Sequence, residues 1–194
     1  MSPTSKPKKA IAKDAPVEVM DYNPHWPKIF DKEKRQVLNA IGNKVVAIEH
    51  VGSTAVPGLG AKPIIDIMVG LRNLSDAKHC IKRLAGIGYE YVPEYEASMP
   101  ERRYFRKGPS NKPNKHYHLH MVEYEGEFWK RHLLFRDYLQ THPDTASEYY
   151  RLKKQLAVEY RLNREAYTEA KTSFIESVVS KANSEKQHAL LKLI

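Results

Sequence analysis

The first regular pattern along the chain is an apolar stripe at helical spacing over residues 27–41. The residues on this stripe are Ile29, Phe30, Val37, Leu38 and Ile41. Pro27 lies in the first turn, where proline is tolerated, and Gly42 follows the last turn, as glycine often does at helix ends. The pattern therefore predicts a helix over residues 27–41.

Two short apolar runs after this helix predict neighbouring strands. Residues 44–51 are rich in β-branched side chains and stop at Gly52, whereas residues 62–71 are apolar on both faces. The turn-forming residues 56–60 separate the two runs. A run that is apolar on both faces is typical of a central strand in a covered sheet.

The rest of the chain predicts one more helix, three strands and then three helices. Residues 75–88, framed by serine and glycine, predict a helix. The ranges that predict strands are 89–94, 102–108 and 116–124. From Glu127 onward apolar residues recur at helical spacing, with breaks near His142-Pro143 and Leu162-Asn163. We expect an α+β (α/β) fold in which a mixed sheet is flanked by helices and followed by a C-terminal helical section.

Length and composition indicate a single folded domain. The chain has 194 residues, of which 41% are hydrophobic, enough for one substantial core. We predict a disordered basic tail over residues 1–16, a domain over 17–183 and a tail over 184–194 that either extends the last helix or docks on a neighbour. Within the domain, residues 17–125 form the sheet core and residues 126–183 the helices.

Cysteine usage and hydropathy predict a cytoplasmic protein without a membrane partner. A single cysteine excludes an intramolecular disulfide, and residues 1–16 lack the apolar region of a secretory signal. No apolar run approaches the roughly 20 residues needed to cross a bilayer. The formal net charge of +9 favours anionic partners, among which charge alone does not choose. The oligomeric state is left open.

Asp66 is the most unusual residue in this pattern. Strand alternation places it on the same face as Ile64 and Met68, so a carboxylate stands among large apolar side chains. Such a group needs a cation, a cluster of hydrogen-bond donors or water beside it. Backbone amides at a strand end would satisfy it. Alternatively, the turn at Gly52 and Ser53 grips a phosphate while Asp66 holds Mg²⁺ against it, the layout of nucleotidyltransferase-type sites.

Several longer blocks of the sequence resemble the GrpB family. They are YNPHWP, AIEHVGSTAVPGLGAKPIIDI, RRYFRKGP, HYHLHMVE, HLLFRDYLQTHP and YTEAKTSFI, which together run from about Tyr22 to about Ala182. The resemblance implies a nucleotidyltransferase fold, in a family that is sometimes fused to dephospho-CoA kinase. It makes Gly52 and Ser53 the phosphate-side turn and Asp66 the acidic, catalytic position.

This chain departs from the two-metal pattern of such transferases. The positions two residues from Asp66, where a second acid is normally found, are Ile64 and Met68. One function is therefore an enzyme that binds a nucleotide with a divalent metal and transfers a nucleotidyl group to an unknown acceptor. The other is a non-catalytic module that keeps the fold and binds a nucleotide, a CoA-like anion or RNA.

Two further segments offer ligands and positive charge. His118 and His120 share one face of a predicted strand, and with Asp66 they form a candidate set for a divalent metal, with Mg²⁺ or Mn²⁺ expected and Zn²⁺ an alternative. Lys62 precedes the Asp66 strand and adds a positive charge there. A basic segment without acids predicts a phosphate clamp. Its residues are Arg102, Arg103, Arg106, Lys107, Lys112 and Lys115.

Overall fold

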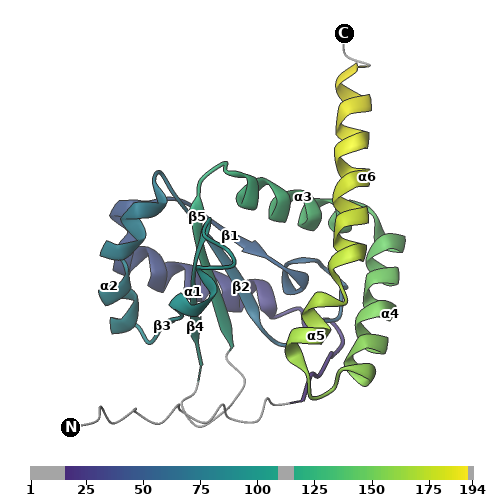
Figure 1. Cartoon of the computed structure of the whole chain (residues 1–194), viewed down its shortest axis with the longest axis horizontal. Helices are drawn as coiled ribbons and strands as arrows, with labels where there is room; N and C mark the ends of the chain where they lie inside the picture. Colours follow the sequence, from purple (N-terminus) through teal and green to yellow (C-terminus); the bar gives the residue numbers. More distant parts are fainter. Residues whose placement is uncertain (1–15, 109–115, 192–194) are drawn as a thin grey trace, which may run out of the picture.

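The computed structural model describes residues 16–108 and 116–191, which form a mixed sheet with helices on both faces (Figure 1). The sheet has five strands in the order β1-β2-β5-β4-β3. Their bounds are β1 Val45–Val51, β2 Ile65–Leu71, β3 Glu90–Tyr91, β4 Arg102–Lys107 and β5 Tyr117–Glu123. The predicted α+β class is confirmed.

The central pair of strands is the one that runs parallel. β2 pairs in parallel with β5 and antiparallel with β1, while β4 pairs antiparallel with both β5 and β3. β2 thus has a neighbour on each side, as its apolar character on both faces predicts. The parallel register sets Asp66 opposite His118 and Met68 opposite His120.

Different helices cover the two faces of the sheet. On one face, α1 (Trp26–Ile41) and α2 (Ile81–Gly86) pack on the β2 side chains Ile65, Ile67 and Val69. On the other face, α3 (Glu127–Thr141) packs Trp129 against Met68. Asp66 lies on this second face, because it alternates with its β2 neighbours.

The C-terminal helices build a second core beside the sheet. They are α3, α4 (Pro143–Glu159), α5 (Arg164–Glu169) and α6 (Thr172–Leu191). Val56 and Leu59, from the segment between β1 and β2, are buried among Leu139, Tyr149 and Val178. The turn that begins at Gly52 is therefore held between the sheet and the helices.

Most predicted elements are present, with local differences. The predicted helix over residues 75–88 is split into a 3₁₀ segment, η3 (Leu74–His79), and α2. The strand predicted over 89–94 shrinks to two residues, because Pro93 has no N–H for the ladder and starts a 3₁₀ turn, η4 (Pro93–Tyr95).

The C-terminal section differs from the prediction at its later helices. The breaks near His142 and Asn163 are confirmed, and a third break after Ala170 separates α5 from α6. α6 continues through residues 184–191, one of the two alternatives that the sequence left open. Residues 1–15 of the predicted tail lie outside the described residues. Within the described ranges, no helix is both long and apolar enough to span a membrane.

Candidate functional site

The parallel pairing of β2 and β5 brings Asp66 together with the two strand histidines. Asp66 Oδ1 lies 3.2 Å from His118 Nδ1 and 3.9 Å from His120 Nε2. The Asp66 side chain keeps 28% of its surface exposed, and those of His118 and His120 keep 24% and 14%. The three side chains therefore form one polar cluster that solvent still reaches.

Asp66 is an ionised carboxylate in this cluster. Burial opposes ionisation, but hydrogen bonds from His118 and His120 outweigh it and hold the pKa of Asp66 well below its usual range. Burial lowers the pKa of His120 to about 4, against the attraction of Asp66. At neutral pH the cluster therefore presents a negative carboxylate beside the neutral imidazole of His120.

Gly52 lies directly against this carboxylate. Its φ of +72° belongs to the left-handed region that favours glycine. A Cβ added there would fall on Oδ2 of Asp66 and lie 3.1 Å from its Cγ. Ser53 follows as the first residue of the 3₁₀ turn η2 (Ser53–Ala55), and its hydroxyl is a neighbour of the Tyr149 phenol on α4. The glycine-serine turn and the carboxylate are thus one contiguous site.

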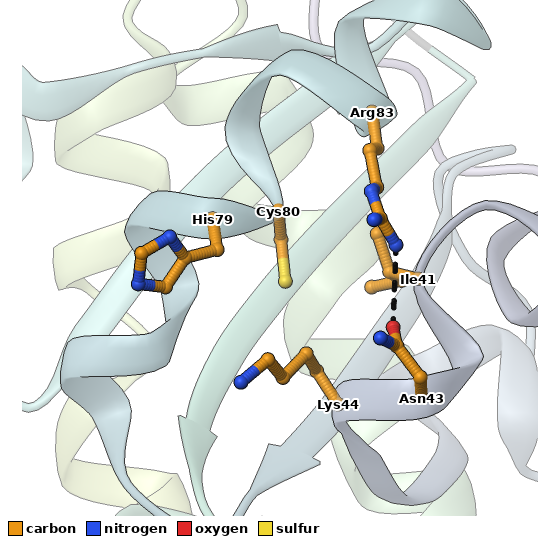
Figure 2. Close-up of a pocket in the computed structure, with 6 residues that line it drawn as sticks. All are labelled: Ile41, Asn43, Lys44, His79, Cys80 and Arg83. Atoms are coloured by element: carbon orange, nitrogen blue, oxygen red, sulfur yellow. Dashed lines mark hydrogen bonds between the residues drawn. The ribbon is translucent and has the colours of Figure 1, made fainter.

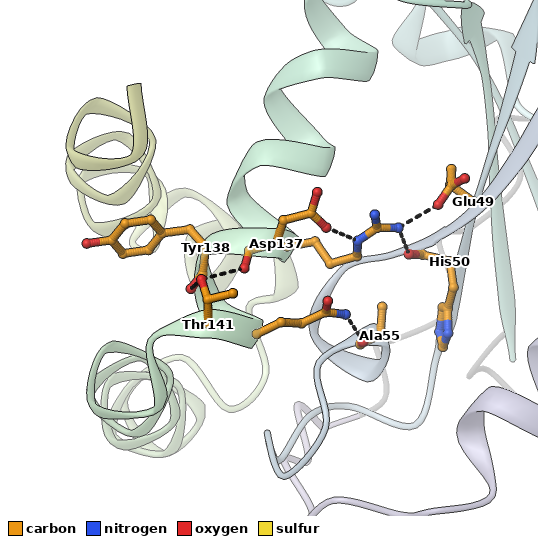
Figure 3. A network of polar contacts seen from close by, with 8 residues as sticks. Glu49, His50, Ala55, Asp137, Tyr138 and Thr141 are labelled. Carbon is orange, nitrogen blue, oxygen red and sulfur yellow. Dashed lines mark hydrogen bonds and ion pairs between the residues drawn. The ribbon is translucent and has the colours of Figure 1, made fainter. Parts of the chain in front are cut away.

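Helix α3 fixes both ends of this turn (Figure 3). Arg136 Nη1 donates to Glu49 Oε2 at 2.7 Å and to the His50 carbonyl at 2.9 Å. Gln140 Nε2 donates to the Ala55 carbonyl at 2.9 Å. Because these bonds flank Gly52 and Ser53 on both sides, the turn is positioned by α3 as well as by its own backbone.

His50 supports the turn from the other face of the sheet. Its ring stacks on Phe30 of α1 with centroids 4.6 Å apart, and its Nε2 lies 3.0 Å from Thr54 Oγ1. Thr54 in turn donates to the Ile64 carbonyl at 3.1 Å. Burial lowers the pKa of His50 to about 4. His50 is therefore a neutral structural residue that ties the turn to the start of β2.

The predicted basic segment is divided by the alternation of β4. Arg102 and Arg106 share the Asp66 face, and Arg102 Nη1 lies 3.2 Å from His120 Nδ1 while its guanidinium packs 5.1 Å from the Tyr104 ring centre. Arg106 makes a two-fold hydrogen bond to Glu90, at 2.9 and 2.8 Å. Only Arg102 of this pair contacts the histidine cluster.

The other basic residues of the segment lie elsewhere. Arg103 and Lys107 are on the opposite face of the sheet, where Arg103 pairs with Glu96 at 3.3 Å and Lys107 with the buried Glu33 at 2.7 Å. The structure therefore does not bring these two residues to Asp66. Lys112 and Lys115 lie outside the described residues.

Three lysines from separate parts of the chain gather beside the site instead. Lys62 and Lys171 lie over the same ring, with Nζ 5.0 and 4.4 Å from the centre of Tyr167. Lys153 of α4 is only 2% exposed and lies 4.7 Å from the Tyr149 ring centre. Sequence reasoning named Lys62 but missed the other two.

These lysines share an environment short of negative charge. Burial, together with the charges of Lys171 and Lys62, lowers the pKa of Lys153 to about 7. Burial also lowers the pKa of Lys171 to about 8, where repulsion by Lys62 outweighs attraction by Asp66. In the described part of the chain, none of the three forms an ion pair within 4.0 Å.

The donors at Asp66 have the chemistry of a metal site but not its arrangement. A carboxylate and two imidazoles suit Zn²⁺ or Mn²⁺. As placed, however, the Asp66 oxygen faces the two ring nitrogens at 3.2 and 3.9 Å, and no group of three or more His, Cys, Asp or Glu side chains among the described residues is arranged to hold a metal ion. The predicted metal set remains a prediction.

A hollow of about 50 Å³ lies away from this site (Figure 2). It is lined by Lys44, His79, Cys80 and Arg83 among others, and Arg83 Nη1 donates to Asn43 Oδ1 at 3.3 Å across it. Cys80 and the neighbouring Ile41 belong to the core under α1 and α2. This hollow is therefore on the opposite side of the sheet from Asp66.

The sequence of this chain matches a known protein family. The model described as "GrpB protein" matches residues 16–181. The UPF0157 protein YqkA of Bacillus subtilis is 37% identical over 88% of this chain and 48% of its own length, so the chain spans about half of that relative. The glutamate-rich protein GrpB of Alkalihalophilus pseudofirmus is 37% identical over 84% of this chain and 94% of its own length.

A solved structure and longer relatives extend this comparison. The crystal structure of the conserved protein GrpB from Enterococcus faecalis has a TM-score of 0.78 and 33% identity, covering 88% of this chain and 99% of that chain. A dephospho-CoA kinase of Mycolicibacterium paratuberculosis is 25% identical over 87% of this chain and 46% of its own length. Relatives fused to dephospho-CoA kinase were expected from the sequence, and this longer relative carries that name.

Proposed function

Because this chain belongs to the GrpB family, we propose that it binds a nucleotide or related phosphate-containing small molecule at the site formed by Gly52, Ser53 and Asp66. The contact between Gly52 and Asp66 carries the proposal. The glycine conformation lets the backbone approach the carboxylate so closely that a side chain would displace it. In the proposed site, the backbone N–H groups of the turn bind the phosphate, and Asp66 binds the cation that accompanies the phosphate.

The charges define what each part of the site does. Backbone amides and the Ser53 hydroxyl receive phosphate oxygens, as turns of this type do. An ionised Asp66 repels a phosphate, so a positive group has to lie between them. The chain offers the ammonium group of Lys62, which the charge of Asp66 attracts. A divalent cation at Asp66, Mg²⁺ or Mn²⁺, would supply the same neutralisation and polarise the phosphate.

A non-catalytic binding module is the second candidate. Ile64 and Met68 are 5% and 0% exposed, so the positions on either side of Asp66 hold core side chains where a second carboxylate would stand. One carboxylate compensates two divalent cations poorly, which favours binding without nucleotidyl transfer. RNA is a further ligand for such a module, and the name of the Mycolicibacterium relative adds CoA-type anions to those worth testing.

Melting temperature measured with nucleotides and CoA precursors, each with and without Mn²⁺, tests the proposal. We expect a stabilising ligand for the wild type and a much smaller shift for Asp66→Asn, because only a bound native state gains stability. Asp76→Asn is the matched control. Asp76 has 31% of its side chain exposed and one ion pair at 3.3 Å, but it lies on η3. Equal shifts in wild type and Asp66→Asn would refute the proposal.

Release of pyrophosphate from the four nucleoside triphosphates distinguishes the two candidates. Turnover that needs Asp66 supports nucleotidyl transfer, whereas binding that needs Asp66 without turnover supports the module. RNA binding through phosphates would weaken steeply with salt. Insensitivity to salt would exclude that version.

A further inference from the structure

We propose that Lys62, Lys153 and Lys171 form a subsite for the outer phosphates of a nucleoside triphosphate. This inference rests on the proposed function and names its substrate class. The three lysines come from the segment before β2, from α4 and from the junction of α5 and α6. Figure 1 shows α5 and the start of α6 beside α4. The subsite therefore joins the sheet to the C-terminal helices.

The first observation is that each of the three lysines packs on a tyrosine ring, and that two of them share one ring. Lys62 and Lys171 both lie within 5.0 Å of the centre of Tyr167, a ring that is 1% exposed. Lys153 packs on Tyr149 and donates to the Gly60 carbonyl. Cation–π contacts and a carbonyl orient ammonium groups but leave their net charge in place.

The second observation is the missing counter-charge. None of these lysines has an ion pair within the described residues, although other cations near the sheet do, such as Arg136 with Glu49 and Lys107 with Glu33. Asp66 is the carboxylate whose field reaches Lys62 and Lys171. Crowded ammonium groups raise the free energy of the native state unless an anion joins them. A chain of phosphates supplies several negative charges at once.

The third observation places the subsite next to the proposed site. Lys153 and the ring under it contact the segment that continues the glycine-serine turn. Lys153 donates to the Gly60 carbonyl, and Tyr149 packs in one cluster with Val56. A phosphate held by that turn is therefore close to the elements that carry the lysines. In this arrangement, the phosphate of a nucleoside monophosphate contacts only the turn. The longer phosphate chain of a nucleoside triphosphate contacts both the turn and the lysines.

Isothermal titration with AMP, ATP and inorganic tripolyphosphate, each with Mg²⁺, tests this inference. We expect Lys62→Gln and Lys171→Gln each to weaken ATP and tripolyphosphate about tenfold, the loss of one charge-assisted hydrogen bond, and AMP less than about twofold. Lys154→Gln is the matched control. It neighbours Lys153 on α4 and lies 4.8 Å from the Tyr150 ring centre, but its side chain is exposed. It should leave all three ligands unchanged.

The melting temperature without ligand gives a second readout. Lys171→Gln should melt at the same temperature as the wild type or higher, because it relieves repulsion. A lysine kept only to pack on Tyr167 would instead lower the melting temperature and leave ATP affinity unchanged, which would overturn the inference.

The outcomes separate this inference from the proposed function. ATP binding that needs Asp66 but not the lysines, or equal wild-type affinity for AMP and ATP, overturns the subsite alone. Tripolyphosphate binding that needs the lysines but not Asp66 supports the subsite and overturns the proposed site. A wild-type protein that binds none of the three ligands overturns both.

Discussion

Asp66 shows that a single functional candidate can be predicted from sequence when it interrupts a regular hydrophobic pattern. Asp66 interrupts an apolar strand, so the strand period alone predicts that its charge needs a partner. Lys153 gave a weaker signal. It lies four residues after Tyr149 on a buried helical face, where lysine is unusual, but helices often bury lysine stems. Lys171 lies between α5 and α6, outside any hydrophobic repeat, so no pattern in the sequence predicts that it is partly buried.

Replacing Gly52 by alanine should destabilise the protein by more than its backbone conformation accounts for. Gly52 combines φ +72° with ψ −172°, a backbone region that is essentially restricted to glycine and costs other residues on the order of 1–3 kcal/mol, and here the new Cβ also displaces the Asp66 carboxylate. Gly58→Ala is the comparison for a positive φ without this clash, because Gly58 has φ +77° and no atom within 4 Å of an added Cβ. Urea unfolding of both variants measures the difference. Equal losses would mean that Asp66 moves aside freely.

Strand β4 shows where sequence reasoning fails at the level of an element. Its basic residues were predicted to bind one phosphate group together, because they are adjacent in the sequence. The strand period instead sends Arg102 and Arg106 to one face and Arg103 and Lys107 to the other. The acidic partners of Arg103, Arg106 and Lys107 are Glu96, Glu90 and Glu33, which lie 7, 16 and 74 residues away and which no local pattern reveals.

Lys107→Met should be strongly destabilising, because it leaves Glu33 of α1 as a buried charge without its ion-pair partner. Glu33 is 2% exposed, and breaking a buried pair typically costs about 3–5 kcal/mol. Arg106→Met, one position away, removes a pair whose members are 40% and 52% exposed and should cost about 1 kcal/mol or less. Denaturant unfolding compares the two. The double variant Glu33→Met/Lys107→Met should recover part of the loss, and failure to do so would count against an uncompensated charge.

At the scale of the whole molecule, the class of fold and most elements followed from hydrophobic periodicity, because burial of one face fixes the period. The order of strands did not follow, since it depends on which distant segments pair. The second core, around Val56, Leu139 and Tyr149, was also unforeseen. It joins a loop to distant helices, since Leu139, Tyr149 and Val178 lie 83, 93 and 122 residues after Val56.

The buried titratable groups predict that stability rises with pH across the whole protein. Lys153 and Lys171 have folded pKa values of about 7 and about 8 against 10.5 when unfolded, so the unfolded state binds more protons between about pH 7 and 10. His50, with a folded pKa of about 4 against 6.5, adds a rise between pH 4 and 6.5. The charged and titratable groups facing the lysines are Lys62, Asp66, Tyr149, Arg164 and Tyr167.

Melting temperature from pH 5 to pH 9 checks this expectation. We expect a continuous rise, on the order of 2–4 °C for each kcal/mol in a domain of this size. Lys171→Met should show a shallower rise between pH 7 and 9, because one of the titrating groups is gone. A melting temperature that is flat or falls above pH 7 in the wild type would contradict the burial of these ammonium groups.

The parallel pairing of β2 with β5 also sets the order in which the protein matures. Asp66 and His118 are adjacent in space but separated by η3, α2, β3, η4 and β4 along the chain. During synthesis, a nascent chain in which β5 has not yet been made contains Asp66 but neither His118 nor His120. In such a chain, the edge of β2 that pairs with β5 is open. The proposed site is therefore completed late in folding, when the crossover closes, and a truncated precursor would lack it.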